Sequence, residues 1–338
     1  MAGMIFSQGS GVADSVFGKS VEPIRALVEQ GAEAFEQQSM IDKIYAMDTT
    51  QNFAEKYTSE TALGAFEPVG EGGAYPKSEF REGYSQVITP DTWKNSFVVT
   101  QEMVEDAKMG KVKQKASAFN LSYGRTREDF AAGLLMGGFS GAVTMAGKQF
   151  SAKAADGKSL FATDHPSITG KGTQSNLYDA DISYDTICYM EEKMQNFTDD
   201  DGNLLNLMPD TIIIPNRARA KKLVFDAVGA DGIPNSANNS FNYMHDRWNI
   251  IVWPYLNKYL TGLTGLTSGK DPIIMMDSKF NEAYFGAVWL DRIKLTVKTT
   301  IDENTDDNVW SGRARYAAGF NNWRAFIGCF AGSSGSTF

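Results

Sequence analysis

Residues 287–330 hold two long extended runs on either side of an acidic stretch, and this arrangement limits the possible folds more than any other feature. From Leu290 to Lys298 apolar and polar residues alternate, which is typical of a strand with one buried face. The stretch 302–308 is rich in aspartate and glutamate and cannot bury itself, so it predicts a loop. A second extended run then returns from Trp310 to Phe330 and leads into a Gly/Ser segment. The sequence therefore predicts a long strand pair with an acidic tip.

The charge of the chain argues against a protein whose main task is to grip phosphates. The 338 residues carry a formal net charge of -9 with a pI near 4.9, whereas such proteins usually present a basic field. Cys188 and Cys329 lie far apart without a CxxC motif, so we expect two free thiols. No secretion signal is evident, and the uncharged stretch from Phe130 to Ala146 is shorter than the ~20 residues that a membrane span needs. We therefore expect a soluble protein that does not enter a membrane.

Residues 59–100 predict a long hairpin that cannot stabilise itself. A Gly/Pro-rich loop from Phe66 to Pro76 precedes two strand-like runs, Phe80 to Thr89 and Thr92 to Thr100. Ordering ~35 residues costs on the order of 35 kcal/mol, and offsetting that cost needs roughly 1,400 Å² of apolar burial. The hairpin must therefore lie on another surface, in its own chain or in a neighbour. The candidates for contacts with a neighbouring chain are Phe66, Tyr75, Tyr84 and Trp93.

The segment from Lys111 to Gly137 predicts one long helix with its apolar residues near one face. Six cations lie along this segment or just ahead of it, with no acid among them. They are Lys108, Lys111, Lys113, Lys115, Arg125 and Arg127. One interpretation of this run is an ordinary solvated helix face, and the other is a binding surface.

The middle of the chain alternates between helical and strand-like segments. Ser183 fits the N-cap of a helix, and a further helix is predicted from Asn216 to Ala227. A large loop is predicted over 226–259, a stretch rich in Asn, Gly and aromatic residues. Strands are predicted over 210–215, 248–255 and 272–276. This alternation predicts a mixed α/β lobe.

Most patterns that carry catalysis are missing from the sequence. His165 and His245 are the only histidines and belong to no HExxH motif or His/Cys cluster. Neither a GxSxG elbow nor a phosphate-binding glycine loop is present, and the acidic clusters lack the spacing of a calcium loop. Asp164 beside His165 is the one suggestive pair, because a carboxylate can orient an imidazole base. Neighbours in an extended chain point to opposite sides, however, so we expect no enzyme, no cofactor and no metal.

Several segments follow one another in an order that resembles the major capsid proteins of tailed bacteriophages, in particular the branch of Mu-like major head subunits. The run GKSLFATDHP from Gly157 to Pro166 matches one family pattern and is followed by Ser-Asn-Leu at 175–177. The stretch from Ile88 to Ala107 is similar to the return of the family's extended loop into its long helix. The strand from Pro209 to Pro215 and the closing strand pair complete the order. The resemblance covers residues 40–330.

This resemblance implies an α+β protein with the fold first seen in the head of phage Hong Kong 97. It implies an N-terminal arm, an extended β-hairpin loop, a peripheral domain with a long spine helix and long strands, and a mixed α/β axial domain. The corresponding ranges are 1–55 for the arm, 56–100 for the extended loop, 101–180 and 287–325 for the peripheral domain, 181–286 for the axial domain, and 326–338 for a C-terminal tail.

The resemblance also implies a non-enzymatic shell protein that assembles into pentamers and hexamers around a double-stranded DNA genome. It implies a scaffolding protein, a portal and weakly bound DNA as partners, assembly in the cytoplasm of a bacterial host and location in the virion, and it leaves open whether decoration proteins bind. The candidates facing scaffold or DNA are Lys108, Lys111, Lys113 and Lys115. Two alternatives remain: an encapsulin-like nanocompartment shell, and a soluble hydrolase that uses Asp164 and His165.

Overall fold

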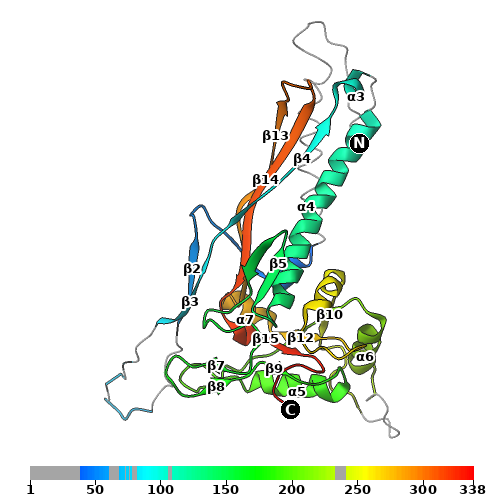
Figure 1. The fold of residues 1–338 in the computed structure, drawn as a ribbon. Helices are drawn as coiled ribbons and strands as arrows, with labels where there is room; N and C mark the ends of the chain where they lie inside the picture. The colour runs from blue at the N-terminus through cyan, green and yellow to red at the C-terminus, as the bar shows by residue number, and fades with distance from the viewer. Residues whose placement is uncertain are drawn as a thin grey trace.

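The computed structural model describes residues 39–60, 68–72, 74–75, 77, 82–105, 109–232 and 241–338. The molecule consists of a long limb above a broad base (Figure 1). In the limb, helix α4 (Met109–Gly137) runs beside strands β4 (Asp91–Val99), β13 (Ala287–Ile301) and β14 (Asn308–Phe320). The base contains a separate five-stranded sheet and most of the remaining helices.

The sheet of the limb has four strands in the order β1-β13-β14-β4. β1 (Ala46–Thr49) is parallel to β13, and the other neighbours are antiparallel. β13 and β14 pair from Ala287 opposite Phe320 to Ile301 opposite Asn308. The predicted long strand pair with an acidic tip is confirmed. Ala287–Asp291 of β13 are all buried, and exposed positions begin only further along the strand. At this lower end both faces of the sheet are covered, since Ala287 and Trp289 lie in the main core while Val288 and Leu290 lie in a separate apolar cluster.

The second strand of this pair is shorter than predicted. β14 ends at Phe320, and a turn leads into the short 3-10 helix η2 (Trp323–Ala325). The Asn322 side chain accepts a hydrogen bond from the Arg324 amide and so caps this helix. The chain then joins the other sheet as β15 (Phe326–Cys329). The prediction of one continuous return strand is wrong. The apolar residues continue past Phe320, but the backbone turns there and enters η2, which Asn322 caps.

The predicted hairpin has a different strand partner. β3 (Glu82–Ile88) pairs with β2 (Glu55–Glu60), whereas β4 pairs with β14 in the limb. Predicting β3 and β4 as the two arms of one hairpin is therefore wrong. The physical reason is aromatic packing across the sheet: Trp93 of β4 stacks on Tyr316 of β14, with ring centroids 5.0 Å apart and an interplanar angle of 3°.

Few described residues attach the β2–β3 hairpin to the rest of the chain. They form a small apolar cluster separate from the main core, made of Tyr57, Ile88, Val288, Leu290 and Ala317. The Tyr57 hydroxyl also donates to Asp48 Oδ2 at 2.6 Å, and its ring lies 5.5 Å from the ring of Phe285. The foot of the hairpin is thus anchored, while its strands project sideways from the limb (Figure 1).

Helix α4 covers one face of the limb sheet and reaches into the base, and the long helix predicted from Lys111 is confirmed. Near the top, Val112, Ala116 and Phe119 pack against the sheet, and near the bottom Phe130 and Leu134 join the main core. A turn after Gly137 leads into a hairpin of β5 (Ala142–Met145) and β6 (Lys148–Ser151). None of the helices in the described ranges is long and apolar enough to cross a membrane.

The base is a mixed α/β lobe around a five-stranded sheet of order β11-β10-β12-β15-β9. Besides β15, its strands are β9 (Leu177–Tyr178), β10 (Thr211–Pro215), β11 (Asn249–Trp253) and β12 (Ile273–Met276). Its helices are α5 (Tyr184–Gln195), α6 (Ala218–Val228), α7 (Ser278–Ala283) and the 3-10 helix η1 (Pro254–Gly262). Ser183 caps α5 as predicted, since its side chain accepts a hydrogen bond from the Thr186 amide. The predicted mixed lobe is confirmed.

The segment predicted as one large loop, 226–259, contains regular structure. β11 pairs in parallel with β10 over its whole length, and η1 follows directly. The loop prediction is wrong for residues 249–259, which lie in β11 and η1. Residues 233–240 lie outside the described ranges. The remaining short elements are α2 (Ile41–Ile44), α3 (Gln101–Glu105), β7 (His165–Pro166) and β8 (Thr173–Gln174).

Candidate functional site

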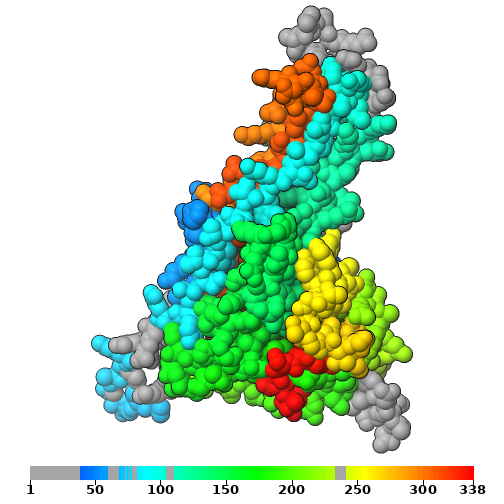
Figure 2. All heavy atoms as spheres, in the orientation of Figure 1, coloured from blue at the N-terminus to red at the C-terminus, as the bar shows by residue number. Residues whose placement is uncertain are grey.

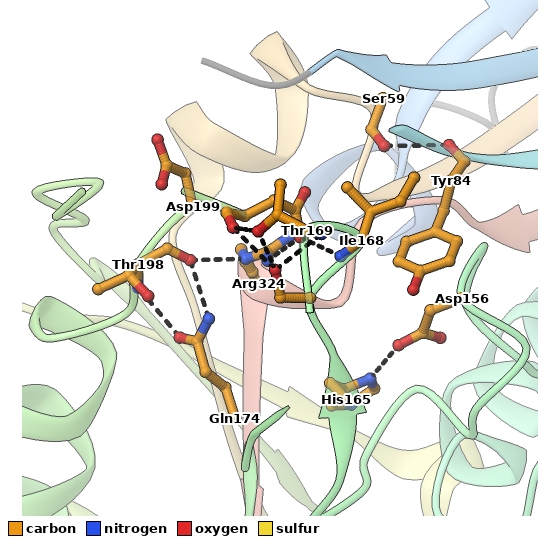
Figure 3. Close-up of polar contacts among 12 residues, drawn as sticks. Ser59, Tyr84, Asp156, His165, Ile168, Thr169, Gln174, Thr198, Asp199 and Arg324 are labelled. Atoms are coloured by element: carbon orange, nitrogen blue, oxygen red, sulfur yellow. Dashed lines mark hydrogen bonds and ion pairs between the residues drawn. The ribbon is translucent and has the colours of Figure 1, made fainter. Parts of the chain in front are cut away.

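Figure 3 shows polar contacts between the loop that follows β6 and the base, with His165 beside Asp156 and a second group of contacts around Arg324. Nδ1 of His165 is 2.6 Å from Asp156 Oδ2, and Nε2 is 3.1 Å from Asn176 Oδ1. The side chains of His165 and Asp156 are 0% and 1% exposed. The imidazole ring stacks on Trp323 with centroids 4.2 Å apart. The GKSLFATDHP run therefore folds so that its histidine is enclosed rather than presented to a substrate.

Asn176 fixes the hydrogen-bonding roles of the imidazole. Its Nδ2 donates to the Phe326 carbonyl at 3.1 Å, and its Oδ1 accepts from the Ala162 amide at 2.9 Å. Because the amide orientation is set by these bonds, Nε2 of His165 must donate to Asn176. Nδ1 of His165 faces the Asp156 carboxylate, so each of these two buried polar groups has a hydrogen-bond partner at a site without access to water.

Arg324 ties this network to the acidic turn after α5. Its Nε donates to the Thr198 carbonyl at 2.9 Å and its Nη2 to Asp200 Oδ1 at 3.1 Å. The guanidinium lies 4.8 Å from the centre of the Trp323 ring, on which His165 also stacks. Within the described ranges, no group of three or more His, Cys, Asp or Glu side chains could hold a metal ion. The Arg324 contacts thus join η2 to the turn that follows α5.

Asp164 does not belong to this network. Its side chain is 56% exposed and forms an ion pair with Lys158. The hydrogen bond from Lys158 lowers the pKa of the Asp164 carboxyl below its usual value. The hydrolase hypothesis built on Asp164 and His165 is wrong in its geometry, because the carboxylate that meets the imidazole is Asp156 and both ring nitrogens are engaged inside the core.

The four residues proposed for contacts with a neighbouring chain differ in their surroundings, and that role stays a prediction for each of them. Tyr75 is 94% exposed and is available to a partner. Tyr84 of β3 is half-buried, and in Figure 3 its ring lies beside Asp156. Burial raises the pKa of Tyr84, and the negative charges of Asp156 and Asp200 add to the rise. Phe66 lies outside the described residues.

Trp93 is engaged in the core of its own chain. Its ring lies 5.2 Å from Phe130, 5.9 Å from Phe150 and 5.0 Å from Tyr316, measured between centroids. Its indole nitrogen donates to the Tyr316 carbonyl at 3.3 Å. Trp93 is thus partly buried by its own chain, and its contact with a neighbouring chain stays a prediction.

The cations predicted along α4 do not form one face. Lys115 Nζ donates to the Val98 carbonyl at 2.6 Å, so it leans on the limb sheet. Lys108 lies outside the described residues. The members of this set that are exposed are Lys111, Lys113 and Arg125. Lys115 is half-buried, and the role of these lysines in facing scaffold or DNA stays a prediction.

Arg127 forms a buried ion pair that joins α4 to β13. Its Nη2 is 3.2 Å from Asp291 Oδ2, and the two side chains are 6% and 8% exposed. The guanidinium lies 5.0–5.6 Å from the ring centres of Tyr123, Trp289 and Tyr316. Including Arg127 in a solvated basic run was wrong. The sequence offered one sign of this pair, which is Asp291 inside an otherwise apolar strand. A buried carboxylate needs a cation as its partner.

Glu128, the next residue of α4, joins two further segments, and the sequence patterns gave no sign of it. It accepts hydrogen bonds from the Ser39 hydroxyl at 2.5 Å, the Met40 amide at 2.9 Å and the Trp253 indole at 2.8 Å. Its side chain is buried. The lower half of α4 is therefore the element on which the first described residues, the limb sheet and the base converge.

The comparisons with known proteins identify the class to which this fold belongs. A family model described as phage capsid protein matches residues 83–328. The chain belongs to this phage capsid protein family. The matched range covers β3 from its second residue on, α4, most of the base and the β13–β14 pair. A search of curated proteins found no match.

Solved structures from two phages and one encapsulin have the same fold at low sequence identity. The capsid of Ralstonia phage GP4 is 10% identical, with a TM-score of 0.52 and 85% of each chain covered. A structure from Mycobacterium phage Patience is 10% identical, with a TM-score of 0.52, and covers 93% of this chain and 89% of that one. The holo-SrpI encapsulin complex from Synechococcus elongatus is 9% identical, with a TM-score of 0.51, and covers 88% and 89%. The expected Hong Kong 97-type capsid fold is confirmed.

Proposed function

We propose that the protein is the major capsid protein of a tailed double-stranded DNA phage and that it self-assembles into pentamers and hexamers of an icosahedral shell. The observation that carries this proposal is the family match over residues 83–328. The acidic chain, with a net charge of -9, suits a shell that encloses DNA without gripping it. We assign no enzymatic activity, because the imidazole–carboxylate pair of His165 is enclosed by the core.

We propose that the parts of the subunit divide the work of assembly along the ranges given by the sequence. Residues 1–55 serve as the arm, 56–100 as the extended loop, 101–180 with 287–325 as the peripheral domain, 181–286 as the axial domain and 326–338 as the tail. Two strands of the base sheet, β9 and β15, fall outside 181–286, so we assign them to the axial lobe as well.

A shell built from one kind of subunit also needs partners that start and limit its growth. We propose a scaffolding protein and a portal as these partners, with weak non-specific contact to the packaged DNA. Assembly would take place in the cytoplasm of a bacterial host, and the finished protein would be located in the virion. The exposed lysines of α4 are the surface that we assign to scaffold or DNA.

The direct test is the size of the purified full-length protein, alone and with its scaffold. We expect gel filtration and negative-stain electron microscopy to reveal closed particles, and particles from producing cells to contain DNA. A protein that stays monomeric in every condition would contradict the proposal. Particles that hold protein cargo instead of DNA would favour the encapsulin-like alternative, which has the same fold.

Replacing Lys111 and Lys113 with Gln is expected to reduce scaffold-dependent assembly or DNA filling while leaving the fold of the subunit intact. Both lysines are exposed, and exposed charges contribute at most about 1 kcal/mol to stability. Their attraction to an acidic partner is screened by salt, so the variant should lose a salt sensitivity that the original protein has. The measurement is nuclease-resistant DNA per particle across a salt series.

The matched control replaces Lys222 and Lys279 with Gln, since both are exposed lysines of the base. The control should fill like the original protein. An equal loss in both variants would indicate a general effect of net charge. Normal DNA filling by the Lys111→Gln, Lys113→Gln variant would mean that this face of α4 is an ordinary solvated surface and not a binding surface.

A further inference from the structure

Residues 331–338, the Gly/Ser segment of the sequence, lie against the edge of the base sheet and are joined to β9 by one β-bridge. The Ser336 amide donates to the Leu177 carbonyl at 3.0 Å, and the Asp179 amide donates to the Ser336 carbonyl at 2.9 Å. Ser336 is thereby paired in parallel with Tyr178 of β9. The Ser333 hydroxyl adds a hydrogen bond to the Tyr178 carbonyl at 2.9 Å. The segment therefore covers the free edge of β9.

The fit of this segment depends on small residues at two close approaches. A Cβ on Gly332 would lie 2.1 Å from the Gly265 carbonyl oxygen, and Gly332 itself has φ +89°. A Cβ on Gly335 would lie 2.6 Å from the Tyr178 backbone. Contacts this short are incompatible with any side chain at either position. The glycines that suggested a flexible end in the sequence are the residues that let the segment lie against the base.

An aromatic side chain anchors the far end of the segment. The ring of Phe338 stacks on Tyr178 with centroids 4.5 Å apart and an interplanar angle of 7°. The Phe338 ring also lies against Tyr189 of α5, with 5.6 Å between the two ring centroids. Figure 2 shows the C-terminal segment, in red, on the surface of the base between parts of the chain drawn in green and yellow. The segment is thus fitted to its site yet lies on the outside of the fold.

Residues 331–338 cover a strand edge that would otherwise be open to another molecule. β9 is the last strand of the five-stranded sheet, and β15 pairs with it on one side only. An open strand edge offers unpaired amides and carbonyls to the strands of another molecule. Residues 331–338 occupy that edge through backbone hydrogen bonds, which is the pattern of strand addition by an extended peptide.

We propose that the edge of β9, with Tyr178 and Tyr189, is a docking groove for an extended strand, and that residues 331–338 are its occupant and act as a removable cap. While docked, the cap prevents the base sheets of two subunits from pairing edge to edge. This inference goes beyond the proposed shell function. It concerns a peptide site on the subunit, so it can be tested whether or not shells form.

The test uses a chain shortened to end at Phe330 and a labelled peptide with the sequence of residues 331–338, AGSSGSTF. The shortened chain should bind the peptide saturably in fluorescence anisotropy, while the full chain should not. Titration should extend into the millimolar range, because tethering supplies an effective concentration of that order. A peptide carrying Phe338→Ala should bind about tenfold more weakly, since it lacks the stacked ring. The shortened chain should also form larger species in light scattering, and the peptide should suppress them.

A second variant keeps the proposal testable if the shortened chain does not fold. In the full chain, Gly335→Val should displace the segment through the close approach to Tyr178, and the Asp179 amide should then exchange its hydrogen at least about tenfold faster, because its bond to Ser336 is lost. Unchanged exchange at Asp179 would overturn the proposal. So would a folded shortened chain that neither binds the peptide nor associates, and so would equal peptide binding by the full chain.

Discussion

Replacing Arg127 with Met is expected to lower the free energy of unfolding of the subunit by about 3–5 kcal/mol, the usual cost of breaking a buried ion pair by removing one partner. Asp291 would remain 8% exposed without its cation, keeping the hydrogen bond from the Trp289 indole. The variant would also lose the guanidinium contacts with the aromatic rings around it. Urea unfolding followed by tryptophan fluorescence measures this loss.

The matched control is Arg125→Met, two residues earlier on the same helix. Arg125 is exposed, so the change should alter stability by no more than about 0.5 kcal/mol. A double variant with Arg127→Met and Asp291→Leu should recover much of the lost stability, because no unpaired charge is then buried. If Arg127→Met costs no more than Arg125→Met, Arg127 is not the buried anchor of α4.

Replacing His165 with Ala is expected to lower the free energy of unfolding by about 3–5 kcal/mol, because Asp156 loses its buried partner and a cavity opens beside Trp323. Asn176 also loses the hydrogen bond from Nε2. The effect should be visible as a lower midpoint of thermal unfolding. Because the site joins the loop after β6 to the base, hydrogen exchange should rise in both segments together.

Asp164→Ala serves as the control for His165. This neighbouring carboxylate is exposed and paired with Lys158 at the surface, where an ion pair contributes about 0–1 kcal/mol. The two variants should therefore differ several-fold in their effect on stability. Equal effects would mean that the buried network has been assigned to the wrong carboxylate.

Local patterns in the sequence were sufficient for the elements that have a strong period or a cap. The alternation after Leu290 predicted β13, the helical spacing after Lys111 predicted α4, and Ser183 marked the start of α5. The family motif around His165 was also visible, as an uninterrupted run of residue types. These signals work because period and capping depend on residues that are close in the sequence.

The candidate site was predictable only in outline. The sequence placed the basic run on α4 but could not separate the exposed Lys111 and Lys113 from the buried Arg127, because the partner of Arg127 is 164 positions away. It singled out His165 and argued against a pairing with the adjacent Asp164, but gave no sign that Asp156 is the partner. It recognised a glycine-rich segment but not the bridge and stacking contacts that hold residues 331–338 against β9.

The sequence by itself determined the long strand pair, the long helix, the mixed lobe and, through its motifs, the family. Only the tertiary structure decided the partners: β2 for β3, β14 for β4, Asp291 for Arg127 and β9 for residues 331–338. The physical reason is that a hydrophobic period reports which face of an element is buried but not what covers it. Which surface covers that face depends on close packing and on the pairing of buried polar groups, and both are made by residues far apart in the chain.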